Sequence, residues 1–119
     1  MMINSLWIGA GGFVGANLRY WLGIMLAGRG GLPATFFINI AGALLIGLIS
    51  GWALRYDINP QILLFLKVGL CGGFTTFSTF ALESTQMLQN GQWLMAGCYM
   101  ILSVVLCIAA VFLGESLVK

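Results

Sequence analysis

The sequence predicts an all-α integral membrane protein with four transmembrane helices, the third of them broken near its middle. Three observations lead to this fold class. The 119 residues are 61% hydrophobic and only 7% charged, a balance far outside the range of soluble domains. Each helical span needs about 20 apolar residues, so the length accommodates four spans with short loops and leaves no room for a soluble domain. Glycines and hydroxyl side chains interrupt one long apolar run, at residues 69–80.

We expect the chain to form one domain over residues 1–119. Its first helix is predicted at residues 3–26. Small residues and one arginine recur there every four positions, at Gly11, Gly15, Arg19 and Gly23. Residues with this spacing share one face of a helix. The glycines on that face allow another helix backbone to approach closely.

The second helix is predicted at residues 33–54, with Pro33 suited to its first turn. A stripe of residues again steps by four along it, polar at one end and small at the other, and we expect it to face protein and not lipid. The stripe consists of Thr35, Asn39, Ala43, Gly47 and Gly51.

The third helix is predicted at residues 61–89, with a break at residues 72–75. Residues 69–80 contain the adjacent glycines Gly72 and Gly73, four hydroxyl side chains and three phenylalanines. In a bilayer an unwound segment is tolerated only where it is buried in protein or lines a cavity, because freed carbonyls and amides need partners. A broken helix is therefore a candidate binding site.

The fourth helix is predicted at residues 93–118, after a tight turn at residues 90–92. Tyr99, Ser103 and Cys107 lie four residues apart and share one face of this helix.

The positive charges are nearly balanced between the two sides of a four-span chain. One side has Arg55, Lys119 and Lys67, and the other has Arg29 and Arg19. Orientation follows the Lys/Arg asymmetry of short loops, so a balanced chain is expected to insert both ways. Two opposite insertions would pair as an antiparallel, dual-topology homodimer. A fixed orientation stays open as the alternative, since weak bias is also compatible with it.

Catalysis has few candidate groups in this sequence. It contains no histidine and no paired carboxylates, and Glu83 is the only acid that lies away from the ends of the predicted spans, since Glu115 is three residues from the end of the fourth. We therefore expect no enzyme, and we expect no organic cofactor and no nucleic-acid partner. Glu83 is either a gating or proton-coupling group or a structural acceptor of hydrogen bonds. Arg19 either extends to the membrane interface or draws anions into a vestibule.

The sequence supplies uncharged hydrogen-bond donors at the break and on the neighbouring helices. Donors without fixed cations beside them suit the passage of a small anion, because a conducting site must replace hydration without binding too tightly. These donors are Asn39, Thr75, Thr76, Ser78, Thr79, Tyr99 and Ser103.

The two phenylalanines and the freed carbonyls of residues 72–80 could each bind an ion, and each also has a purely structural interpretation. Phe77 and Phe80 share a face and could turn their electropositive ring edges toward an anion, or they are ordinary packing residues. Carbonyls freed at the break would suit a cation such as Na⁺, shared between two copies. The alternative is a simple kink satisfied by Ser/Thr side chains and water.

The segment GLCGGFTTFSTF at residues 69–80, Asn39, and the run GGFVGANLR ending at Arg19 resemble the Fluc (CrcB) fluoride-channel family. The resemblance implies an antiparallel dual-topology homodimer in the bacterial inner membrane, with two passive fluoride pores and a central structural Na⁺. It implies that Asn39 and the ring edges of Phe77 and Phe80 contact fluoride, the two rings of a pore coming from opposite subunits.

The same resemblance assigns the remaining positions. Carbonyls of Gly72 and Thr75 would hold the Na⁺, and Arg19 would lie at the aqueous entrance with Glu83 close to the pore. Ser78 and Thr79 would lie at polar positions near the pore. We add Thr35, Tyr99 and Ser103, which lie on the polar faces of the second and fourth helices, as further residues of the fluoride pathway.

Two other classes of function compete with a channel. A small dual-topology multidrug/proton antiporter would need an acid on the first helix, and residues 3–26 contain none. A non-conducting membrane assembly subunit would explain the glycine faces but not the donors at the break.

Overall fold

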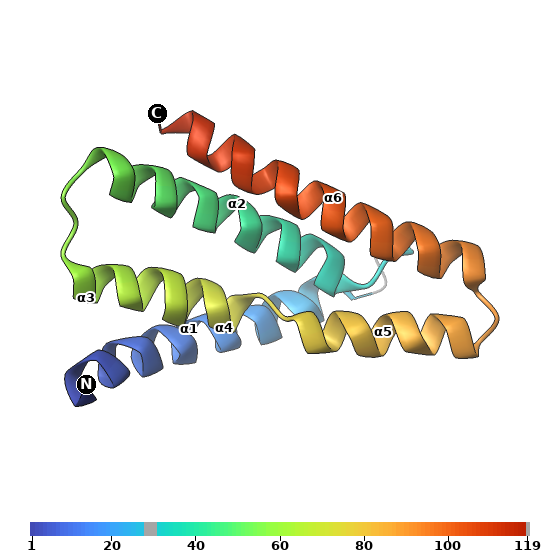
Figure 1. Cartoon of the computed structure of the whole chain (residues 1–119). Coiled ribbons are helices and arrows are strands. Elements are labelled where there is room, and N and C mark those ends of the chain that lie inside the picture. The colour runs from blue at the N-terminus through green and yellow to red at the C-terminus, as the bar shows by residue number, and fades with distance from the viewer. Residues whose placement is uncertain (28–30, 119) are drawn as a thin grey trace.

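The computed structural model describes residues 1–27 and 31–118, and the elements it contains there are all helices (Figure 1). Arg29 and Lys119, which enter the charge balance, lie outside the described residues. The helices are α1 (Met2–Leu26), α2 (Ala34–Arg55), α3 (Pro60–Leu63), the π-helix η1 (Leu64–Cys71), α4 (Gly72–Phe74), α5 (Phe77–Gln89) and α6 (Trp93–Leu117).

Three helical stretches of the described chain are long and apolar enough to cross a membrane. They are Ala34–Arg55, Pro60–Gln89 and Trp93–Leu117. The helix α1 has 25 residues, but Asn4, Asn17 and Arg19 lower its mean hydropathy. A multi-pass membrane protein is thus supported, and the passage of α1 through the membrane stays a prediction.

The helices form two parallel pairs. In one pair α1 runs beside η1 and α4, with Gly11 against the carbonyl oxygen of Phe65 and Gly15 against that of Leu70. In the other pair α2 runs beside α6, with Gly47 against Val111. These glycines leave no room for a Cβ, so the backbones lie in direct contact.

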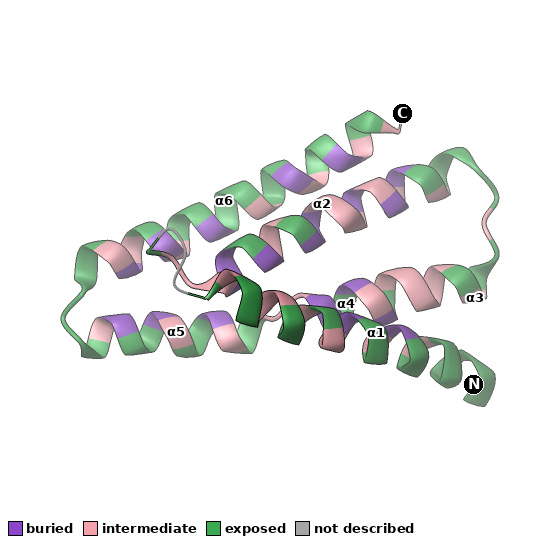
Figure 2. Cartoon of the chain, turned by 180° about the vertical axis from the view of Figure 1, so that it is seen from behind, coloured by how far each residue is buried: buried purple, intermediate pink, exposed green. Residues whose placement is uncertain are grey.

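The predicted packing faces of the first two helices are confirmed, except at Gly23 of α1, where an added Cβ would meet nothing within 4 Å. Gly11 and Gly15 are the buried residues of α1. On α2 the stripe from Thr35 to Gly51 is buried at Thr35, Ala43, Gly47 and Gly51, and Asn39 is half-buried. Figure 2 shows buried residues running along α2 and α6, whereas most of α1 is exposed.

The break in the third helix consists of Thr75 and Thr76, which are both extended, with φ, ψ of −87°, 158° and −151°, 121°. Gly72 and Gly73 remain helical in α4, although the prediction placed the break at residues 72–75. The reason is packing. A Cβ on Gly73 would lie 2.8 Å from the carbonyl oxygen of Gly12, so this glycine serves the contact with α1, and the β-branched threonines that follow favour extended backbone.

Local sequence explains how the helices around the break begin and end. The Thr76 side chain caps α5 by accepting from the backbone N–H of Thr79 at 3.3 Å. At the other end of α5, Gly91 has φ of 78°, and Gln92 N–H bonds to the carbonyl of Met87 at 2.9 Å. This is a Schellman ending, which needs glycine at the left-handed position.

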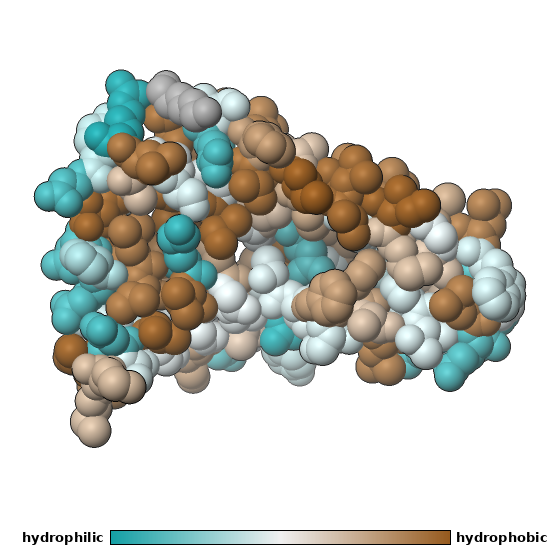
Figure 3. All heavy atoms as spheres, in the orientation of Figure 1, coloured by the Kyte–Doolittle hydropathy of each residue, from teal (hydrophilic) through white to brown (hydrophobic). Residues whose placement is uncertain are grey.

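The chain begins and ends at the same end of the molecule, as expected for a chain that crosses the membrane four times. Figure 1 places both termini and the α2–α3 connection at one end, and the α5–α6 turn at the other. In Figure 3 the surface over α6 between these ends is apolar, and hydrophilic residues gather mainly at the end with the termini. Figure 3 also shows a hollow between α2 and the broken helix.

Candidate functional site

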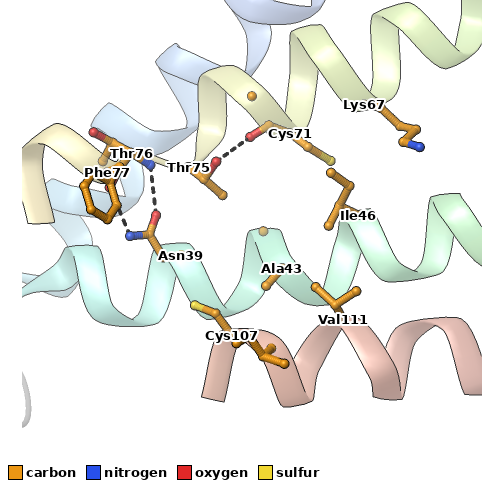
Figure 4. A pocket seen from close by; sticks show the side chains of 13 residues that line it. Asn39, Ala43, Ile46, Lys67, Cys71, Thr75, Thr76, Phe77, Cys107 and Val111 are labelled. Carbon is orange, nitrogen blue, oxygen red and sulfur yellow. Dashed lines mark hydrogen bonds between the residues drawn. The ribbon is translucent and has the colours of Figure 1, made fainter. Parts of the chain in front are cut away.

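A pair of hydrogen bonds joins α2 to the break (Figure 4). Asn39 donates from Nδ2 to the carbonyl oxygen of Thr76 at 3.1 Å, and its Oδ1 accepts from the Thr76 backbone N–H at 2.9 Å. Because a backbone N–H can only donate, it fixes which end of the amide is oxygen. The Nδ2 group carries two hydrogens, and Thr76 takes one of them. The second is left for another acceptor, such as an anion.

The break separates backbone carbonyls from their helical partners. In an unbroken helix the Gly72 carbonyl would accept from the N–H of Thr76, and the Thr75 carbonyl from that of Thr79. Here the Thr76 N–H bonds to Asn39, and the Thr79 N–H bonds to Thr76 Oγ1. Released carbonyls of this kind coordinate Na⁺ in broken membrane helices. No group of three or more His, Cys, Asp or Glu in the described ranges could hold a metal, so a cation here would depend on backbone oxygens.

An open hollow of about 380 Å³, the α2–η1 pocket, lies between α2, η1 and α6. Its described lining includes Asn39, Thr76 and Phe77 at one end and Lys67 toward the other. Gly72 and Thr75, the predicted Na⁺ residues, line it too. The structure therefore brings the predicted cation residues and part of the predicted fluoride pathway to one hollow.

A second hollow of about 540 Å³, the α1–α5 pocket, lies on the other side of the break. It is lined by Arg19, Thr35, Thr79 and Glu83, and shares Thr76 with the α2–η1 pocket. Arg19 donates from Nε to the carbonyl oxygen of Gly73 at 3.1 Å. This cation therefore stabilises the C-terminal end of α4, where the partial charge of the helix is negative.

Glu83 joins three helices through its two carboxylate oxygens. Tyr99 on α6 donates its hydroxyl to Oε1 at 2.8 Å, and Thr35 on α2 donates to Oε2 at 3.2 Å. These two hydrogen bonds support the interpretation of Glu83 as a structural acceptor, and both come from residues predicted to line the pathway.

The two phenylalanines lie on one side of α5 in different surroundings. Their ring centroids are 5.6 Å apart. Phe80 is 9% exposed, and its centroid lies 5.1 Å from that of Tyr99. Phe77 is 78% exposed and lines the α2–η1 pocket. Within one chain, packing accounts for Phe80 and leaves Phe77 uncovered.

Two of the remaining predicted residues differ in burial. Ser103 is buried on α6, and its Oγ has no hydrogen-bond partner among the described residues. An unsatisfied buried hydroxyl is costly, so this atom calls for a ligand or water. Ser78 is exposed and lies 3.5 Å from Thr76 Oγ1 through its own Oγ.

Thr76 is predicted from the sequence only as a donor, without a place in the site. The structure makes it the residue that the two hollows share. Threonine directly before a helical segment is a preferred N-cap residue, and this could have indicated its role. Cys107 also lines the α2–η1 pocket. The only sequence feature that could have indicated this is its four-residue spacing from Ser103, and that signal is weaker.

Comparison with known proteins identifies the family. The family model described as "CrcB-like protein, Camphor Resistance (CrcB)" matches residues 6–115. The chain belongs to the CrcB family. The expected family is confirmed by this match.

Relatives from this CrcB family are similar over nearly their whole length. The chain is 45% identical over 116 residues to the fluoride-specific ion channel FluC 1 of Nitrobacter hamburgensis, covering 94% of this chain and 92% of that protein. It is 41% identical to fluoride-specific ion channels FluC of Elusimicrobium minutum (94% and 90% covered) and Ruminiclostridium cellulolyticum (99% and 94%). Because these CrcB relatives are named as ion channels, the expectation of a non-enzymatic protein is confirmed.

Proposed function

We propose that this protein is a subunit of a passive, fluoride-selective ion channel. The CrcB relatives named above are fluoride-specific ion channels. The observation that carries the proposal here is the clamp between Asn39 and Thr76, which holds an amide donor at the break beside two hollows. No Asp or Glu is among the described residues that line the α2–η1 pocket, so an anion would meet no repulsive carboxylate there.

Selectivity follows from the cost of dehydration. Fluoride is small and strongly hydrated, so it enters a low-dielectric site only where donors closely replace its water. Amide and hydroxyl donors with no cationic side chain in direct contact with the ion allow it to enter and to leave. The pathway residues are Asn39, the ring edges of Phe77 and Phe80, and Thr35, Ser78, Thr79, Tyr99 and Ser103, with Arg19 and Glu83 in the vestibule.

The channel is an antiparallel, dual-topology homodimer with two pores. Support for a second copy comes from Phe77, whose ring is 78% exposed beside an open hollow, and from the balanced charges of the chain. A second, inverted copy would cover this ring and close the open side of the α2–η1 pocket.

A structural Na⁺ at the dimer centre is part of the proposal. The carbonyl oxygens of Gly72 and Thr75 have lost the N–H partners that an unbroken helix supplies, since those donors bond to Asn39 and Thr76. Two such oxygens from each copy form a donor set of the kind that Na⁺ prefers. Bound there, Na⁺ supplies a fixed positive charge between the two breaks.

In the cell, the protein resides in the bacterial inner membrane and lowers cytoplasmic fluoride. The weak acid HF crosses membranes uncharged and dissociates in a neutral cytoplasm, which traps the anion. A passive pore then lets an inside-negative potential expel it, at about 2.3 kcal/mol per charge per 100 mV.

Fluoride efflux from proteoliposomes, followed with a fluoride electrode, tests the function. We expect rapid efflux that needs no pH gradient and is far slower for chloride. Phe77→Ile should abolish or sharply slow it, whereas Phe13→Ile, at a ring that is 73% exposed on α1, should not. Equal leakage of both halides, or of neither, would refute the channel, and drug–proton exchange would favour the antiporter.

The dimer and its cation have tests of their own. Light scattering of the detergent-solubilised protein should give the mass of two chains. Dialysis against Na⁺-free buffer should impair efflux, and Na⁺ should restore it. Undiminished efflux after exhaustive dialysis would count against the cation.

A further inference from the structure

Lys67 is the charged side chain in the described lining of the α2–η1 pocket. Figure 4 shows it leaving η1 on the side that carries Cys71 and Thr75, with Ile46 of α2 across the gap. The side chain is half-buried in the single chain. No carboxylate among the described residues lines the same pocket, so its charge is not neutralised there.

The position of Lys67 along the third helix is unusual for a lysine. It lies seven residues after Pro60 and eight before Thr75, which is roughly 10 Å from the helix start and roughly 12 Å from the break at 1.5 Å per residue. Ionisable groups within membrane spans face a water-filled cavity or a polar partner and mark ion pathways. The cavity next to Lys67 is the α2–η1 pocket, which ends at Asn39, Thr76 and Phe77.

Lys67 and Arg19 lie on opposite sides of the break. Because α1 and η1 run parallel, with Gly11 beside Phe65 and Gly15 beside Leu70, Arg19 reaches only the end of α4, at Gly73. It lines the α1–α5 pocket, whereas Lys67 lines the α2–η1 pocket. Among the described residues, one cationic side chain thus lines each of the two hollows that meet at Thr76.

We propose that Lys67 is an anion-recruiting residue of the α2–η1 pocket, which raises the local concentration of fluoride without contacting the ion at the break. The inference rests on the proposed channel function. A unit charge about 12 Å away, in surroundings between bulk water and protein, enriches a monovalent anion about twofold to threefold. At this distance the ammonium attracts the ion without trapping it.

A purely structural lysine would behave differently in salt. Its stem could cover apolar surface while its charge reaches the interface, and its loss would then slow efflux equally at every salt concentration. Recruitment through the field is screened, because the Debye length falls from about 30 Å at 0.01 M to about 8 Å at 0.15 M ionic strength.

Fluoride efflux of the full-length protein in liposomes, at about 10 mM and about 300 mM ionic strength, tests the inference. Lys67→Met should lower the rate about twofold to threefold at low salt and leave it unchanged at high salt. Lys67→Arg should keep the wild-type rate at both. Arg55→Met removes an equal charge from an exposed site outside the pocket and serves as the matched control, with no change expected. Lys67→Gln takes the place of the Met variant if that protein does not reconstitute.

The outcomes separate this inference from the function on which it rests. A Lys67→Met channel as fast as wild type at low salt would overturn the inference and leave the channel intact. A loss that persists at high salt, or that Arg55→Met reproduces, would also overturn it. Absence of fluoride efflux from the wild type would instead overturn the channel itself, and recruitment with it.

Discussion

Replacing Asn39 by leucine removes both hydrogen bonds of the clamp at once. The Thr76 N–H and carbonyl, now bonded at 2.9 and 3.1 Å, would each be left without a partner. Each buried polar group left unpaired costs about 1–3 kcal/mol of stability. Because Thr76 is half-buried, water can take the place of some of the lost hydrogen bonding. We therefore expect the loss of both bonds to lower the free energy of unfolding by about 2–3 kcal/mol.

Conduction should suffer from the same change. A hydrogen bond to a charged partner contributes about 1.5–3 kcal/mol, and each 1.36 kcal/mol is a factor of ten in rate. The loss of the free Nδ2 hydrogen should therefore slow fluoride efflux about 10- to 100-fold. Thermal unfolding in detergent and electrode-monitored efflux measure the two effects.

A second variant separates structure from conduction. Asn39→Asp keeps an acceptor for the Thr76 N–H but removes the donor and adds negative charge to the anion path. It should unfold at a higher temperature than the leucine variant and still fail to conduct. Asn17→Leu is the control, because the Asn17 side chain bonds to Phe13 of its own helix. Wild-type efflux from either Asn39 variant would refute the role of the clamp.

Two further changes test the packing around the site. Tyr99→Phe removes the donor 2.8 Å from Glu83 Oε1, which should cost about 1.5–3 kcal/mol of stability; an unchanged unfolding midpoint would contradict this. Gly73→Ala places a Cβ 2.8 Å from the Gly12 carbonyl oxygen and should cost about 1–3 kcal/mol by overpacking. Gly97→Ala, which meets nothing within 4 Å, should not destabilise the protein, and equal effects of the two glycine changes would show that the contact with α1 is unimportant.

Much of the architecture was predictable because it depends on local patterns. The glycine spacing of α1 and the four-residue stripe of α2 each predicted a buried face, and Gly11, Gly15, Thr35 and Gly47 are buried. The interruption of the third helix was predicted from its glycines and threonines.

The details of the break depended on contacts that a single sequence does not display. Glycine weakens an isolated helix, yet Gly72 and Gly73 stay helical because α4 packs against α1. The π-helix at Leu64–Cys71 had no signal that we recognised. The bond between Asn39 and Thr76 joins residues 37 positions apart, and only the tertiary fold reveals that one side chain holds both backbone atoms.

The glycine seam between α1 and η1 has a consequence for motion. Atoms there touch without side chains, as where a Cβ on Gly69 would lie 2.6 Å from the carbonyl oxygen of Ile8. Such a contact has no rotamers that could absorb a shift. A shift of α1 against η1 would bring these backbone atoms into collision, so we expect the two helices to move together when the residues around the break rearrange.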